Sequence, residues 1–191
     1  MTEEIIGQAP EYIKKLFQNN SDGHDAAHSI RVYTNARKIA EEYPECDLEV
    51  VSLAALLHDV DDHKLFDTVN NMNARTFLKD RRVADEVIER ICEVINGVSF
   101  SKNRGKRPAT LEGQIVQDAD RLDAMGAIGI ARTFAYGGKV GRPLEDSLRH
   151  FDDKLLLLKD EMNTEAAKRI AEHRHKYMEE FLAKFHDETD F

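Results

Sequence analysis

The chain has 191 residues, of which 41% are hydrophobic and 33% charged, and its formal net charge at pH 7 is −9. This negative balance argues against a broad nucleic-acid-binding surface, because phosphate contacts require positive charge. No apolar stretch approaches the roughly 20 residues that a membrane-spanning helix needs, and the acidic start at Glu3 and Glu4 does not resemble a signal peptide. We therefore expect a cytoplasmic protein with neither a nucleic-acid nor a membrane partner, whose two cysteines are free thiols.

Apolar residues recur at helical spacing along the whole chain, and the alternation typical of strands never persists. The pattern predicts helices over residues 2–19, 24–43, 48–59, 71–80, 82–97, 111–124, 126–136, 144–160 and 164–187. Asp47 and Thr110 stand where the N-caps of two of these helices belong. No repeat, low-complexity segment or linker interrupts the series, so we predict an all-α bundle formed as a single domain over residues 1–191.

The last predicted helix carries apolar residues on one face, namely Ile170, Tyr177, Phe181 and Phe185. We expect this face to pack on the core of the domain, and a homodimer interface is the alternative. Five histidines fall on patterns that indicate surface positions, namely His63, His150, His173, His175 and His186.

A histidine and an aspartate, His58 and Asp59, end an apolar run in the helix predicted over 48–59. Both groups are costly to bury unless they are paired, hydrogen-bonded or bound to a cation. Ala55 and His58 share the buried face of this helix, and Asp59 lies about 100° further around its axis. Both side chains can therefore reach one ion only if that ion lies close to the helix.

Two other predicted helices offer partners for this pair. His28 shares a stripe with Val32, and His24 lies one turn earlier on the same face. Asp118 and Asp120 lie on different faces of a later helix, and periodicity alone does not choose between them. Taken singly, an inward histidine is usually a core residue, and a buried aspartate is usually a cap or an ion-pair partner. Four such residues together favour a divalent metal with two nitrogen and two oxygen ligands.

The order of these residues resembles the HD-domain superfamily of metal-dependent phosphohydrolases. The local contexts that carry the resemblance are His28-Ser-Ile-Arg-Val, Ala-Ala-Leu-Leu-His58-Asp59 and Ala119-Asp120-Arg121-Leu122. The phrases at residues 117–124 and 132–138 look like a bacterial subgroup of small stand-alone HD hydrolases. The resemblance implies an HD-type helical bundle with a motif-bearing core over about residues 20–140 and C-terminal helices over about 144–187.

The resemblance also implies a ligand set for one divalent metal ion, namely His28, His58, Asp59 and Asp120. It selects Asp120 because the last aspartate of the family stands in an Ala-Asp-x-Leu-like context, and Asp118 stays as a second choice or as a partner that orients a ligand. Imidazole ligands favour Mn²⁺, Fe²⁺, Co²⁺ or Ni²⁺ over Mg²⁺, which prefers oxygen.

Catalytic groups are expected beside this metal. Several members of the superfamily carry an acidic residue, often Glu, four positions after the motif histidine, and here that position is Asp62, preceded by Asp61. These carboxylates are candidates to orient or deprotonate a water molecule, and His24 is a candidate to protonate the leaving oxygen or to hold phosphate.

A phosphate substrate also requires cations. The candidate substrate-binding residues are Arg31, Lys102, Arg104, Lys106, Arg121 and Arg142. Arg31 follows His28 by three positions, and Arg121 follows Asp120 directly. The three candidates between residues 102 and 106 belong to a basic loop that either clamps a polyphosphate or is simply solvated.

We therefore predict a metal-dependent phosphohydrolase that acts on a small anionic phosphate substrate, with a nucleotide as the favoured class. The sequence does not separate a nucleotidase from a nucleoside triphosphate pyrophosphohydrolase. One alternative is an inorganic or alarmone-type pyrophosphate hydrolase. Another is a non-catalytic regulatory protein that binds metal and nucleotide.

Overall fold

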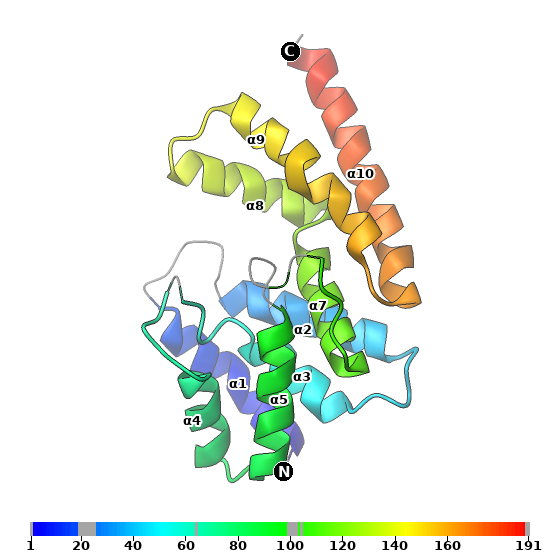
Figure 1. The fold of residues 1–191 in the computed structure, drawn as a ribbon. Coiled ribbons are helices and arrows are strands. Elements are labelled where there is room, and N and C mark those ends of the chain that lie inside the picture. The colour runs from blue at the N-terminus through cyan, green and yellow to red at the C-terminus, as the bar shows by residue number, and fades with distance from the viewer. Residues whose placement is uncertain (1, 19–25, 64, 99–102, 104, 190–191) are drawn as a thin grey trace. The chain divides into compact units, whose positions relative to one another are not determined.

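A computed structural model describes residues 2–18, 26–63, 65–98, 103 and 105–189 (Figure 1). The described residues form helices and short connections without a β-strand, which confirms the all-α prediction for this part of the chain. The helices are α1 (Thr2–Leu16), α2 (Ala26–Ala40), α3 (Leu48–Leu57), α4 (Met72–Asp80), α5 (Asp85–Val98), α7 (Leu111–Asp123), α8 (Gly126–Lys139), α9 (Leu144–His150) and α10 (Glu165–Thr189). None of the described helices combines the length and the apolar character that a bilayer crossing requires.

The chain divides into two compact units, residues 1–120 and residues 121–191, and the division falls within α7. The expectation of a single domain over 1–191 stays a prediction. Each unit is described below by itself.

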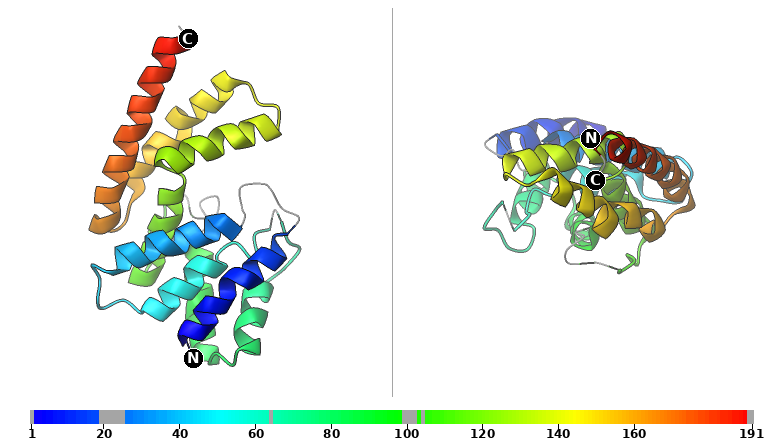
Figure 2. Two further views of the ribbon diagram at one scale, coloured as in Figure 1. Left: turned by 180° about the vertical axis from the view of Figure 1, so that it is seen from behind. Right: turned by 90° about the horizontal axis from the view of Figure 1, so that it is seen from above.

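Helix α3 is the centre of the first unit. Every residue from Val50 to Leu57 is buried, because α1, α2 and α5 all pack against this helix (Figures 1 and 2). A helix that is apolar on every side is stable only when neighbours enclose it in this way. The end of α3, where His58 and Asp59 follow, is therefore held deep in the unit.

Helix α2 packs against α3 through the stripe that the sequence predicts. His28, Val32, Ala36 and Ile39 are all buried, at spacings of three and four residues. His28 stands in the first turn of the helix as part of this stripe. The packing of α2 on α3 thus brings the imidazole of His28 toward the chain that follows α3.

The second unit contains α8, α9 and α10. After α9 the chain continues as a π-helical turn (Phe151–Leu155) and a 3₁₀ segment (Leu156–Glu161), where the sequence predicts one helix over 144–160. Apolar spacing does not distinguish these wider and tighter turns from an α-helix, because Phe151, Leu155 and Leu158 are buried in either case.

Two predictions for α10 are wrong. Tyr177 is 51% exposed, and the fully buried neighbour on this helix is Met178, so the buried face is rotated from the predicted one. Phe181 and Phe185 do pack as expected, in an aromatic cluster with Phe134. His175 is only 8% exposed, with its Nε2 atom 3.3 Å from a Glu179 carboxylate oxygen, so it is not a surface residue. Whether any face forms a homodimer stays a prediction.

Asp47 caps α3, as predicted. Its Oδ1 atom accepts hydrogen bonds from the backbone N–H groups of Glu49 and Val50, and its Oδ2 atom lies 2.8 Å from Arg90 of α5. We expect Asp47→Ala to lower the free energy of unfolding by about 1–2 kcal/mol, because α3 loses its cap. Urea denaturation measures the effect, and Glu45→Ala, which removes an exposed charge two residues away, should change stability little. Equal stability of the two variants would contradict the assignment.

Candidate metal centre

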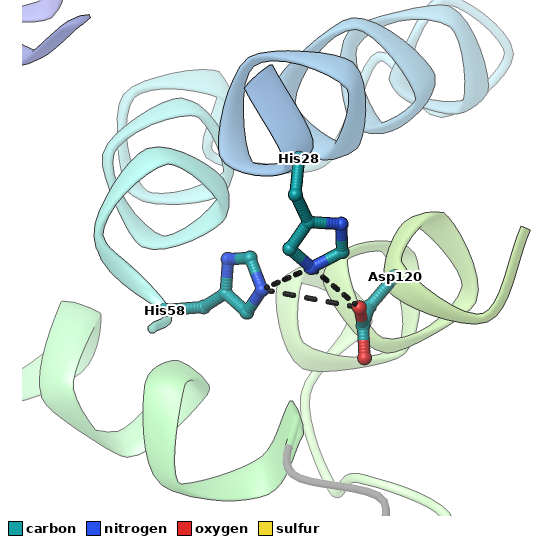
Figure 3. Close-up of side chains that lie close together, drawn as sticks. All are labelled: His28, His58 and Asp120. Carbon is teal, nitrogen blue, oxygen red and sulfur yellow. Dashed lines mark hydrogen bonds and ion pairs between the residues drawn. The ribbon is translucent and has the colours of Figure 1, made fainter. Parts of the chain in front are cut away.

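Two imidazoles and a carboxylate from three helical regions point toward one another (Figure 3). His28 belongs to α2, His58 follows the last residue of α3, and Asp120 belongs to α7. The two imidazole Nε2 atoms are 3.2 Å apart. The Oδ1 atom of Asp120 lies 3.3 Å from Nε2 of His28 and 3.8 Å from Nε2 of His58. One ligand atom from each residue is thus available within the space of a single ion.

Asp59 completes the cluster. Its Oδ2 atom lies 3.3 Å from Nε2 of His58 and 3.5 Å from Nε2 of His28. The helix ends at Leu57, and the chain turns through residues 58–62 with a hydrogen bond from the Asp62 N–H to the Asp59 carbonyl. This turn lets adjacent residues face the same point. Asp59 therefore lies beside both imidazoles of the group that His28, His58 and Asp120 form.

The backbone of α3 orients the His58 ring. The Nδ1 atom of His58 lies 2.9 Å from the carbonyl oxygen of Ala55, which can only accept a hydrogen bond. Nδ1 therefore carries the proton, and in the neutral imidazole Nε2 presents its lone pair to the cluster. Metal-binding histidines are commonly held in this way by a backbone carbonyl.

The cluster is buried on its imidazole side and more open on its carboxylate side. The side chains of His28 and His58 are each 3% exposed, that of Asp59 is 11% exposed, and that of Asp120 is 24% exposed. Asp120 is therefore the most exposed of these four side chains.

The pKa values of His58 and Asp120 reflect the negative charge of the two aspartates. Burial by itself lowers the pKa of His58, but the charge and hydrogen bond of Asp59, together with the charge of Asp120, raise this pKa to about 9. Burial raises the pKa of Asp120, but the hydrogen bond from His28 and the charges of both histidines bring this pKa below its ordinary value. The two aspartates therefore hold a positive charge at this point, which a divalent cation can supply in place of a proton.

Of the two aspartates that periodicity left open, Asp120 is the one in the cluster. Asp118 is fully buried elsewhere on α7. Asn35, which no motif marks, lies seven residues after His28 on the buried face of α2 and donates a hydrogen bond of 3.4 Å to the Ala119 carbonyl. A polar side chain on an apolar stripe is the signal that points to it.

The predicted catalytic residues have different surroundings. Asp62 lies in the turn that carries Asp59, and its side chain is 15% exposed. Both carboxylate oxygens of Asp61 accept hydrogen bonds from the backbone of α4, so its predicted catalytic role finds no support in this geometry. His24 lies outside the described residues.

The predicted substrate-binding residues have different surroundings. Arg31 is half-buried on α2 one turn after His28, Lys106 is exposed, and Lys102 and Arg104 lie outside the described residues. Arg121 is 5% exposed and bonds to the carbonyl and carboxylate of Glu161, so a substrate contact finds no support there. Arg142 lies in the second unit, over the ring of Tyr136.

Comparison with known proteins agrees with the motif and the fold. The model of the HD domain family matches residues 25–125. This chain belongs to the HD domain family. The resemblance inferred from the sequence motifs is thereby confirmed.

Several known proteins are similar to this chain over nearly its whole length. The uncharacterized protein YpgQ of Bacillus subtilis is 41% identical over 184 residues, which cover 92% of this chain and 89% of YpgQ. The crystal structure of YpgQ in complex with ADP superposes with a TM-score of 0.84 at 36% identity, covering 96% of this chain and 97% of that one. The structure of an HD-superfamily hydrolase from Bacillus thuringiensis has a TM-score of 0.82 at 38% identity, covering 100% and 99% of the two chains.

The raised pKa of His58 predicts the pH dependence of stability in the metal-stripped protein. The pKa is about 9 in the folded protein against an ordinary value of 6.5. The proton on His58 therefore stabilises the folded state fully below pH 6.5, and this contribution is lost as the pH rises to 9. We expect the free energy of unfolding to fall by about 1–3 kcal/mol across this window. Urea denaturation in a chelator at several pH values measures it, and His58→Gln should flatten the profile. A wild-type protein that gains stability over the same window would contradict the assignment.

Proposed function

We propose that this protein is a metal-dependent phosphohydrolase that acts on a phosphoester or phosphoanhydride, with a nucleotide as substrate. The observation that carries the proposal is the meeting of two imidazole nitrogens and two carboxylate oxygens at one buried point, with neighbouring atoms 3.2–3.8 Å apart. Membership of the HD family and the likeness to an HD-superfamily hydrolase support it.

The donors fit a single divalent ion. Two neutral imidazoles and two carboxylates neutralise a 2+ charge, and they leave positions open on an octahedral ion for water and substrate. Nitrogen ligands favour Mn²⁺, Fe²⁺, Co²⁺ or Ni²⁺ over Mg²⁺. The tautomer of His58 that the Ala55 carbonyl selects is the one that a metal ligand requires.

A bound divalent ion would polarise a phosphate oxygen and make a water molecule more acidic. In this proposal Asp62 orients the attacking water and accepts its proton, because its carboxylate is partly exposed in the same turn as Asp59. His24 is proposed to hold phosphate or to protonate the leaving oxygen.

The chain as a whole is acidic, so local cations must attract an anionic substrate. Arg31 is the proposed first contact for phosphate, since it lies one turn along α2 from His28. Lys102, Arg104 and Lys106 are proposed to add positive charge around the polyphosphate. Arg142 remains a further proposed contact.

A nucleotide is proposed because YpgQ, which resembles this chain along most of its length, has been crystallised in complex with ADP. The likeness to this complex makes a nucleoside phosphate the first class of substrate to test here.

The first test is a substrate panel. We expect protein that is stripped of metal and reloaded with Mn²⁺ to hydrolyse nucleotides, and His58→Asn to lose this turnover because a ligand is removed. Separate assays for orthophosphate and pyrophosphate, with nucleoside mono-, di- and triphosphates and an alarmone, identify the bond that is cut. If nucleotides bind but no turnover that depends on His58 is observed, the result would instead indicate a regulatory protein.

The second test separates the ligands from the base. Asp59→Ala should abolish both metal binding and activity, because a carboxylate ligand is lost. Asp62→Ala should keep one metal ion per chain but slow turnover by about a hundredfold or more. Metal analysis and steady-state kinetics measure the two effects, with Asp67→Ala as the control for removal of a nearby exposed charge. Loss of the ion from Asp62→Ala would make Asp62 a ligand.

A further inference from the structure

The turn after α3 and the start of α4 are tied together by side chains from both sides. The carboxylate of Asp61 accepts hydrogen bonds from the backbone N–H groups of Asn73, at 2.9 Å, and Ala74, at 3.0 Å. In return, the side-chain amide of Asn73 donates a hydrogen bond of 2.7 Å to the carbonyl of Val60. We call this set of three bonds between Asp61, Asn73 and the two backbones the α4 clasp.

Helix α4 depends on this clasp because the residue at its own N-cap position does not cap it. Asn71 has φ 53° and ψ 44° and makes no side-chain cap hydrogen bond. The first N–H groups of a helix lack partners within the helix, and a negative charge beside them is stabilising. Asp61 supplies both the acceptors and the charge from a distant part of the chain.

The clasp binds the turn at Val60 and Asp61, which lie between Asp59 and Asp62, the two acidic residues of the proposed chemistry. Val60, whose carbonyl is held, is fully buried and lies directly after Asp59. Asp61, whose side chain is held, lies directly before Asp62. The hydrogen bond from the Asp62 N–H to the Asp59 carbonyl, at 3.0 Å, joins both acidic residues into the same turn.

The other end of the clasp is anchored in the core of the first unit. Phe77 and Leu78 of α4 are buried at 1% and 0% exposure. The hydroxyl of Tyr12 in α1 donates a hydrogen bond of 3.1 Å to the carbonyl of Asn73. The start of α4 is therefore held in place by the core, and its hydrogen bonds to the turn come from residues outside the metal centre.

We propose that Asp61 is a positioning residue, and that the α4 clasp sets the direction of the Asp59 and Asp62 carboxylates toward the metal centre. This inference rests on the function proposed above. In this inference Asp61 and Asn73 orient the turn that carries Asp59 and Asp62, and neither contacts substrate or metal.

The test compares Asp61→Ala, Asp61→Asn and Asn73→Ala with the control Asp67→Ala, which removes an exposed charge later in the same connection. Mn²⁺ affinity is measured by titrating metal-free protein, and kcat and KM are then measured at saturating Mn²⁺. Thermal unfolding shows that each variant is folded at the assay temperature. Asn73→Ala tests the clasp from its other side if Asp61→Ala does not fold.

We expect Asp61→Ala to weaken Mn²⁺ binding about tenfold, which is the lower end of the loss seen when groups that support a metal ligand are removed. At saturating Mn²⁺ its kcat should fall while KM changes little, because Asp62 is displaced. Asp61→Asn, which keeps one oxygen acceptor, should recover part of both losses. The double variant of Asp61→Ala and Asn73→Ala should lose less Mn²⁺ affinity and less kcat than the sum of the losses in the two single variants, because both substitutions break the same clasp.

Wild-type Mn²⁺ affinity and kcat in folded Asp61→Ala would overturn the inference, even if the variant unfolds at a lower temperature, because Asp61 would then only cap α4. This outcome differs from failure of the proposed function. If the wild-type protein binds Mn²⁺ without turnover, the affinity comparison still decides the inference, and if it binds no Mn²⁺, both proposals fall.

Discussion

The structure depends on one electrostatic constraint, which is that two aspartates and two histidines share a buried point. The carboxylates of Asp59 and Asp120 lie against the same two imidazoles, and their negative charges favour a positive charge beside them. The charges of Asp59 and Asp120 raise the pKa of His58, which favours a proton on this imidazole. A divalent ion supplies more charge in the same space. The arrangement is therefore suited to binding a cation.

The packing of the first unit satisfies this constraint. Helix α3 is enclosed by α1, α2 and α5 and ends at the cluster, so the apolar core holds the imidazole of His58 while the chain after it is free of helical geometry. The turn at 58–62 can then aim two adjacent side chains at one point. The burial of an apolar helix thus helps to place the side chains of the cluster, and hydrogen bonds within α3 and from α4 hold the turn that follows.

Much of this could be predicted from the sequence, for physical reasons. Helical periodicity placed His28 on the buried stripe of α2, and the Asp47 cap located the start of α3. Periodicity did not choose between Asp118 and Asp120, because both lie on faces of α7 that are buried or partly buried; the family pattern was needed. The clasp between Asp61 and Asn73 was not predictable, since a cap supplied from twelve residues away leaves no local pattern. The rotated face of α10 was missed because Tyr177 is apolar enough to fit a stripe that it does not join.

The hydrogen bond between His58 and the Ala55 carbonyl has a consequence for how this centre tolerates mutation. In many metal sites the group that orients a histidine is another side chain, and a single substitution removes it. Here the orienting group is backbone, which every amino acid at position 55 provides. Evolution can therefore vary the residue at 55 within the limits of core volume without changing the tautomer of His58. The helix backbone thus fixes which nitrogen of His58 faces the cluster.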